Sequence, residues 1–242
     1  MARKVKIDNS ILKRRGYKRR SHEPVNIVCR ILIVCEGSKT EPNYFKAFHK
    51  KKRGLYVVDL EFGGGGINTK KVVDEAIRRK TQAELENNPY DRVWAVFDKD
   101  DFPDVAFNAA ILKAKKNGIG CAWSNEAFEL WYLLHFCKRE TPMSRTEYKE
   151  AISRAVNDSP AYKDKKEYVY EKNNPENYSI MNKYGSQDSA IRNALDMEKY
   201  FTDQSFATHN PCTKVHEIVL QLMGKDEELN QEISERVNQK LD

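Results

Sequence analysis

Two short acidic segments each follow directly on an apolar run, and their side chains are of the type that binds divalent metal ions. Glu36 comes after the run CRILIVC, and Asp98 and Asp100 come after the run RVWAVF, separated from each other by a single lysine. Each run is rich in β-branched residues and is typical of a strand that is buried in a parallel sheet. Because parallel strands end at a common edge of their sheet, we expect the three carboxylates to lie close together.

Carboxylates gathered at one edge repel each other, and this repulsion raises their pKa values unless a cation lies between them. Hard oxygen ligands in such number favour Mg²⁺ or Mn²⁺. The sequence therefore predicts a metal site built from four acids, Glu36, Glu41, Asp98 and Asp100. Gly37 would let the chain turn sharply behind Glu36 and let a phosphate approach the backbone. The alternative for any single acid is a solvent-facing loop residue or a helix cap.

A further acid lies inside an unusually apolar segment. The run EAFELWYLLHF predicts a buried helix, capped by Ser124, that is apolar on nearly every side. Glu129 lies in the middle of this surface, and a buried carboxylate needs a cation, a partner or a proton. We therefore expect Glu129 either to bind or support the metal ion or to form a structural salt bridge. His135 lies on another side of the same helix and is interpreted as a core histidine.

Strand and helix patterns alternate through the first half of the chain. Apolar runs predict strands at residues 29–35, 56–62, 92–97 and 119–123, with helices between them. This alternation indicates an α/β fold with a parallel sheet and helices on both faces. After residue 137 the strand patterns fade, and helices are predicted at residues 145–157, 187–203, 213–223 and 226–240. We expect a catalytic domain at residues 26–137 and an α-helical C-terminal extension at residues 138–242.

Four glycines, Gly63–Gly66, follow the second predicted strand and precede Asn68, a good helix cap. Such a run can offer backbone N–H groups to a phosphate at a helix start, or it can form a tight turn. The segment does not match the pattern of a nucleotide-hydrolysing phosphate loop. A turn is the interpretation that we favour.

The positive charge of the chain is concentrated at its N-terminus. Residues 1–20 contain nine Lys or Arg and one Asp, whereas the whole chain has a net charge of +6. A basic arm at residues 1–25 is typical of segments that bind nucleic acid phosphates by charge and counterion release, although it can also be a solubilising tail. The predicted contacts to nucleic acid are Lys13, Arg14, Arg15, Lys18, Arg19, Arg20 and Lys39.

The acidic motifs resemble a known pattern. Glu36-Gly37 after one strand and Asp98-x-Asp100 after another are similar to the TOPRIM motifs of topoisomerases, primases and overcoming-lysogenization-defect nucleases. More closely, the segments ILIVCEGSKTEPNYF, VWAVFDKDDF and SNEAFELWYLLHF resemble the RloB family, with weaker similarity in NPCTKVHEIVLQL. The similarity covers nearly the whole chain. Glu41 is five residues after Glu36, which departs from the shorter spacing of primase-like enzymes but is similar to RloB-like sequences.

The resemblance implies a fold and an activity. It implies a TOPRIM-like, Rossmannoid sheet and a Mg²⁺- or Mn²⁺-dependent nuclease that hydrolyses DNA or RNA. RloB-like proteins are found beside bacterial restriction loci, are typically paired with an AAA- or ABC-type ATPase, and are linked to abortive infection of phage. Tyr170 and Lys172 resemble a Y-x-K element of these proteins. Lys172 is thereby a candidate catalytic residue beside Glu36, Asp98 and Asp100.

In the expected mechanism, Asp98 and Asp100 hold the metal ion, and Glu36 acts as a general base or binds a second ion. Lys39 or Lys172 would balance the charge that develops on the phosphate. One alternative is a haloacid-dehalogenase-like phosphatase, whose D-x-D motif, however, follows the first strand of its sheet. The other alternative is a non-catalytic subunit that binds nucleic acid or regulates the ATPase.

Sequence patterns also bear on partners and location. The apolar residues Leu229, Ile233, Val237 and Leu241 recur every four residues, so one face of the last helix docks on the protein's own core or on a second copy in a homodimer. No apolar run approaches the roughly 20 residues that span a bilayer, and the N-terminus lacks the apolar segment of a secretory signal. We therefore expect a cytoplasmic protein with no membrane partner.

Overall fold

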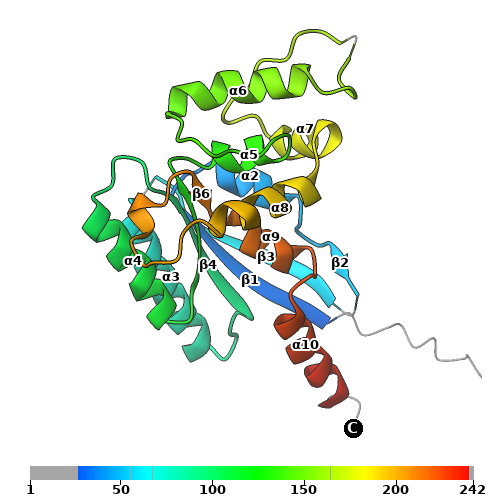
Figure 1. Ribbon diagram of the computed structural model, residues 1–242. Coiled ribbons are helices and arrows are strands. Elements are labelled where there is room, and N and C mark those ends of the chain that lie inside the picture. Colours follow the sequence, from blue (N-terminus) through cyan, green and yellow to red (C-terminus); the bar gives the residue numbers. More distant parts are fainter. Residues whose placement is uncertain (1–26, 55, 67, 164, 240–242) are drawn as a thin grey trace, which may run out of the picture.

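The computed structural model describes residues 27–54, 56–66, 68–163 and 165–239, and the basic arm lies outside them (Figure 1). The strands are β1 (Ile27–Cys35), β2 (Lys52–Arg53), β3 (Tyr56–Gly64), β4 (Arg92–Asp98), β5 (Gly120–Asn125) and β6 (Cys212–Thr213). The helices are α2 (Thr40–Lys46), α3 (Thr69–Leu85), α4 (Asp104–Lys116), α5 (Glu129–Leu134), α6 (Arg145–Asn157), α7 (Asn177–Tyr184), α8 (Gln187–Glu198), η1 (Phe206–Thr208), α9 (Val215–Leu222) and α10 (Glu227–Gln239). None of these described helices combines the length and the apolar composition needed to cross a membrane.

The strands form one six-stranded sheet in the order β2-β3-β1-β4-β5-β6. The four central strands are parallel, and the short edge strands β2 and β6 are antiparallel to their neighbours. The α/β class is confirmed, but the expectation of a parallel sheet is wrong at both edges. β2 forms because Gly54, with a φ of 54°, lets the chain fold back from Arg53 onto Tyr56. β6 has only two residues and comes from a distant part of the chain, so no local pattern predicts it.

Side chains of the central strands alternate between two cores, one on each face of the sheet. Ile31 and Ile33 belong to one core, and Leu32 and Val34 belong to the other. Helices α3 and α4 cover the second face, whereas α2, α5 and most of the C-terminal helices cover the first (Figure 1). The expected helices on both faces are therefore present, and the central strands are buried on both sides, as parallel strands usually are.

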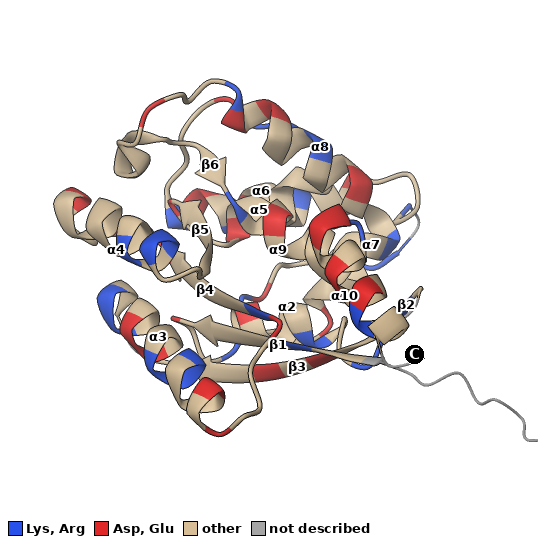
Figure 2. Cartoon of the chain, turned by 90° about the horizontal axis from the view of Figure 1, so that it is seen from below, with Lys and Arg blue, Asp and Glu red and all other residues tan. Residues whose placement is uncertain are grey.

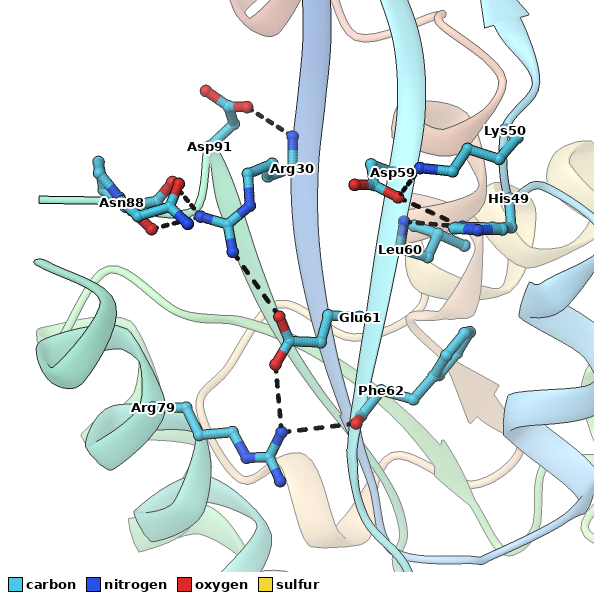
Figure 3. Close-up of polar contacts among 11 residues, drawn as sticks. Arg30, His49, Lys50, Asp59, Leu60, Glu61, Phe62, Arg79, Asn88 and Asp91 are labelled. Atoms are coloured by element: carbon cyan, nitrogen blue, oxygen red, sulfur yellow. Dashed lines mark hydrogen bonds and ion pairs between the residues drawn. The ribbon is translucent and has the colours of Figure 1, made fainter. Parts of the chain in front are cut away.

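Polar contacts fix β3 beside β1 (Figure 3). Glu61 of β3 accepts a hydrogen bond from Arg79 of α3 at 3.4 Å and pairs with Arg30 of β1 at 3.7 Å. At the outer edge of β3, beyond the short β2, His49 Nδ1 accepts a hydrogen bond from the Leu60 amide at 3.0 Å. The contact satisfies a backbone group that a free strand edge would leave exposed. The pair between Glu61 and Arg30 holds β3 against the strand whose end carries the first acidic motif.

The helix that carries Glu129 is shorter than the sequence predicts. Ser124 is not its cap but a residue of β5, where its hydroxyl lies 2.9 Å from that of Thr213 on β6. The helix itself begins at Glu129, and every residue in it is buried, as expected. His135 follows the helix as a buried core residue, with Nδ1 2.9 Å from the Trp131 carbonyl oxygen. Burial lowers the pKa of His135 to about 4.

The C-terminal part of the chain shares its core with the sheet. Buried residues of α6, α7, α8 and α9 join the core on the first face, and β6 extends the sheet. Trp94 of β4 donates from Nε1 to Gln221 of α9 at 2.7 Å inside this core. The last helix docks on the protein itself, because Leu229 and Ile233 are fully buried, while acidic residues occupy much of the rest of α10 (Figure 2). The predicted extension is thus integrated with the sheet.

Candidate metal and catalytic site

Glu36 and Asp98 lie side by side at the C-terminal edge of the sheet. Glu36 follows the last residue of β1, and Asp98 is the last residue of β4, the neighbouring parallel strand. The Glu36 amide donates to the Val96 carbonyl at 2.9 Å, and the Asp98 amide donates to Glu36 Oε2 at 3.2 Å. The structure therefore brings both predicted residues to the same edge and joins them directly.

Asp100 has a φ of 38°, a conformation that residues other than glycine rarely adopt. Its Oδ2 lies 2.9 Å from Arg145 Nη1, and Asp98 Oδ2 lies 3.2 Å from Nη2 of the same arginine. One guanidinium thus bridges the two acids of the D-x-D motif. Backbone strain of this kind is concentrated at functional sites.

Glu41 reaches the site because Gly37 has no side chain. Glu41 is in the first turn of α2 and is buried. A Cβ atom on residue 37 would lie 2.4 Å from Glu41 Oε2, so a larger residue there would displace this carboxylate from its present position. Gly37 does not have a positive φ. The glycine is thus explained by the close approach of Glu41 rather than by the sharp turn expected from the sequence.

Glu129, at the start of α5, receives two partners from the loop before α7. Tyr170 donates its hydroxyl to Glu129 Oε1 at 3.2 Å, and Lys172 Nζ lies 3.5 Å from the same oxygen. Thr40 of α2 donates to the Lys172 carbonyl at 3.3 Å, which ties this loop to the helix that follows Glu36. The structure thus brings the Y-x-K element to the acidic cluster.

Burial and mutual repulsion raise the pKa values of Asp98, Glu41 and Glu36. Burial is the main reason that the pKa of Asp98 lies well above its ordinary value; Glu41 and Glu129 raise it further, and Arg145 lowers it in part. Burial likewise raises the pKa of Glu41 and that of Glu36. A cation placed among these groups would lower all of these pKa values, because it favours the charged form of each carboxylate.

The carboxylates also have unused ligand atoms. Glu41 Oε2 and Glu129 Oε2 are buried and have no hydrogen-bond partner among the residues that the structure describes, which is unfavourable for a polar atom. With Asp98, Asp100 and Glu36 they form a set of hard oxygen donors that fits Mg²⁺ or Mn²⁺. Within the described part of the chain, these acids do not place three ligand atoms within 4.8 Å of one another. A metal ion would therefore have to draw them together.

A second group of potential metal ligands lies elsewhere, where α8 and α9 meet. Glu198, His216 and Glu217 place their ligand atoms within 4.8 Å of one another. Lys214 contacts Glu198 and lies 2.9 Å from Glu217. Its ammonium supplies the positive charge that the two carboxylates need, so this group is a satisfied ion-pair network.

Arg145 is the site residue that the sequence analysis missed. It is the first residue of α6, whose start is fixed by a capping box between Ser144 and Glu147. The capping box is readable in the sequence. Nothing local shows, however, that this helix start faces Asp98, which is 47 positions away in the chain.

The four-glycine segment closes onto the end of β1. The amides of Gly65 and Gly66 donate to the carbonyls of Cys35 and Glu36 at 2.9 and 2.7 Å. Gly64 has a φ of 81°, and a Cβ atom there would lie 2.2 Å from the Cys35 carbonyl oxygen. Both amides are occupied, so the structure supports the tight turn rather than the phosphate-binding interpretation.

A cavity of about 1010 Å³ opens beside the acidic cluster. It lies between the start of α6 and the loop that carries Lys172, and Glu129 contributes to its wall. The basic residues of its lining are Arg145, Lys149 and Lys172. Lys39, another predicted contact to nucleic acid, is exposed where α2 begins. The other predicted contacts lie in the arm, outside the described residues.

Comparison with known proteins adds one finding. The model of a family described as RloB-like protein matches residues 31–222 of the chain. The matched stretch contains all five acids of the cluster together with Arg145 and Lys172. No curated protein and no solved structure matches the chain. The family match confirms the resemblance that the sequence motifs indicate.

Proposed function

The chain belongs to the RloB-like protein family, and from this premise we propose that it is a metal-dependent nuclease of the TOPRIM type. The observation that carries the proposal is the buried acidic cluster at the ends of two neighbouring parallel strands. In this cluster Glu41 and Glu129 each keep a carboxylate oxygen without a partner in the described part of the chain. Buried carboxylates in this number are unfavourable unless a cation lies among them.

Asp98 and Asp100 are the residues that would hold a divalent ion, with Glu36, Glu41 and Glu129 around them. When bound, Mg²⁺ or Mn²⁺ neutralises the charge of a phosphodiester and of the oxygen that leaves it. The D-x-D acids suit this role because both already bind a shared cationic group in the structure.

Two residues of the chain would act on the reacting atoms. Glu36 would accept the proton of the attacking water, because its carboxylate lies beside Asp98 at the same edge of the sheet. Lys172, whose ammonium lies beside Glu129 and lines the cavity, would balance the negative charge that develops on the phosphate.

The proposed substrate is DNA or RNA, with the basic arm of residues 1–20 binding the phosphate backbone. We further propose, from the family resemblance, that the protein acts with an AAA- or ABC-type ATPase in bacterial defence against phage. The ATPase partner would sense the infection, and the acidic cluster would cleave the nucleic acid.

The acids of the D-x-D motif provide the test. Asp98→Asn and Asp100→Asn should each lower the cleavage rate at least about 100-fold, since each loses a charged metal ligand. Cleavage would be followed on separate labelled DNA and RNA pools, with Mg²⁺ or Mn²⁺, in the presence and absence of the ATPase. Asp101→Asn is the matched control, because Asp101 is the next acid in the chain and is exposed. Full activity in Asp98→Asn would contradict the proposal.

A non-catalytic subunit that binds nucleic acid or regulates the ATPase is the second candidate. One observation favours it: Arg145 and Lys172 neutralise acids of the cluster without a metal ion. If the folded protein binds nucleic acid but never cleaves it, with the ATPase and either metal present, this second candidate is the better account.

A further inference from the structure

Arg145 occupies the position where the proposed function needs a metal ion. Among the described residues, it is the one whose side chain pairs with both Asp98 and Asp100, at 3.2 Å and 2.9 Å. A divalent ion held by the same two carboxylates would lie against the guanidinium, and two positive charges at such a distance repel strongly in a partly buried site. The guanidinium and the metal ion are therefore competing occupants of one site.

The side chain of Arg145 lies beside a cavity that could accept it if it left Asp98 and Asp100. This side chain is 39% exposed, whereas that of Asp98 is 10% exposed, so the arginine side chain has more room to change position than the aspartate has. Arg145 is the first residue of α6 and lines the cavity of about 1010 Å³. Lys149 lies one helical turn further on and lines the same cavity. Glu150 and Glu171 line it as well, so a guanidinium that leaves Asp98 and Asp100 meets acidic groups there that can balance its charge.

Once released from the acids, Arg145 and its basic neighbours would form a binding site for a phosphate. A guanidinium binds two oxygens of a phosphate at once, and Lys149 and Lys172 add positive charge nearby. Before metal binding, the acids compensate the charges of Arg145 and Lys172. After metal binding, the guanidinium of Arg145 no longer has Asp98 and Asp100 as partners and becomes available to a phosphate beside the scissile position.

We propose that Arg145 is a displaceable counter-ion. Its guanidinium occupies Asp98 and Asp100 until a divalent ion replaces it there. The displaced guanidinium then binds a phosphate of the nucleic acid in the adjoining cavity. This inference rests on the proposed function and deepens it. Metal and nucleic acid would then bind cooperatively, and the cooperativity would be reciprocal, as linkage requires.

Calorimetric titration with Mn²⁺ alone tests the first half of the proposal. Arg145→Ala removes the competitor, so its affinity for Mn²⁺ should be about three- to tenfold higher than that of the wild type, the range expected for partly exposed ion pairs. Arg145→Lys keeps a charge that cannot span both acids and should give an intermediate affinity. Arg154→Ala is the matched control, because Arg154 is an exposed arginine of the same helix, and it should bind Mn²⁺ as the wild type does.

Binding of a fluorescent single-stranded oligonucleotide, as DNA and as RNA, tests the second half. In Ca²⁺, which replaces Mg²⁺ to suppress turnover, Arg145→Ala should bind the oligonucleotide about three- to tenfold more weakly than the wild type. In EDTA the two proteins should bind it alike, because Arg145 is then still paired with the acids. If Arg145 only supported the fold, its replacement would instead weaken the binding of both Mn²⁺ and the oligonucleotide. Thermal melting of each variant identifies loss of folding.

The possible results distinguish a failure of the role proposed for Arg145 from a failure of the proposed metal site. Wild-type protein that binds Mn²⁺, combined with an Arg145→Ala variant that remains folded but binds Mn²⁺ no more tightly, overturns the role of Arg145 alone. Wild-type protein that binds no Mn²⁺, or an Asp98→Asn variant that binds it equally well, overturns the proposed metal site and this inference with it.

Discussion

At the level of single residues, the candidate site contains three acids, Glu41, Asp98 and Glu129, that are buried away from water. Asp98 and Glu41 are 7% and 5% exposed, and Arg145 and Lys172 offset part of the unfavourable burial. Ion pairs of this kind seldom recover the full desolvation free energy of both partners. The cluster should therefore reduce the stability of the metal-free protein, and metal binding should restore it.

This reasoning gives a prediction for Asp98 in the metal-free protein. Burial raises the pKa of Asp98 above its ordinary value of 3.8, so the protonated form favours the folded state. That contribution is fully present below pH 3.8 and is lost as the pH rises through the raised pKa of the folded state. At pH 8, Asp98→Asn should therefore raise the melting temperature by roughly 2–4 °C, which corresponds to about 1 kcal/mol in a protein of this size.

The comparison between variant and wild type isolates this one group. His135, whose pKa is lowered to about 4, destabilises the fold as the pH falls, and this effect is common to both proteins. The difference in melting temperature should shrink at acid pH, and Mn²⁺ should stabilise only the wild type. A variant that melts lower than the wild type at pH 8 would show that Asp98 is a structural residue.

At the level of elements, the site depends on how β1 and β3 end. The turn after β3 donates two amides to the end of β1, and this contact fixes the backbone on which Glu36 stands. Gly64 makes the closest approach, because its α-carbon faces the Cys35 carbonyl oxygen. The glycines of this turn therefore differ in what a side chain would meet.

Replacing two of these glycines by alanine, one at a time, should separate the effect of backbone strain on stability from the effect of steric overlap. Gly66 has a φ of 73° and open space around its α-carbon, so Gly66→Ala should reduce the free energy of unfolding by about 1–2 kcal/mol through strain alone. Gly64→Ala also places a Cβ atom 2.2 Å from the Cys35 carbonyl oxygen and should reduce this free energy by at least about 2 kcal/mol more. Urea denaturation of both variants measures the difference. If both variants lose the same free energy of unfolding, the turn relieves the overlap at residue 64 without cost.

At the level of the whole molecule, charge is divided between the arm and the remainder. Nine of the 42 Lys and Arg residues lie within the first 20 positions, whereas the described part of the chain mixes acidic and basic residues over its elements (Figure 2). Binding of nucleic acid through non-specific charge should therefore depend mainly on the arm.

Deleting residues 1–20 should flatten the dependence of nucleic acid affinity on salt. The slope of log K against log salt concentration should fall in magnitude by up to about 8 for duplex DNA, if all nine cationic residues contact phosphates. Fluorescence anisotropy between low and moderate salt measures this slope. A full-length protein with Gln at the nine positions is the control, because it keeps the length of the arm and removes its charge. An unchanged slope would assign the arm another purpose, such as docking the ATPase.

The sequence by itself determined the features that are encoded locally. Strands β1, β3 and β4 lie where apolar runs predict them, and α6 has the predicted bounds. The stripe on α10 correctly indicates a docked helix, since Leu229 and Ile233 are buried. Because the acids follow directly on predicted parallel strands, their position at one edge also follows from the sequence. In each case the burial of neighbouring residues leaves a periodic pattern in the chain.

The tertiary structure alone decided which distant residues meet at that edge. The pairing of Arg145 with Asp98 and Asp100, and of Tyr170 and Lys172 with Glu129, joins segments that no local pattern connects. The same holds for β6, which places Thr213 against Ser124 and makes Ser124 a strand residue instead of a helix cap. Such contacts depend on the path of the whole chain through space, whereas periodicity and capping report only on neighbours along it.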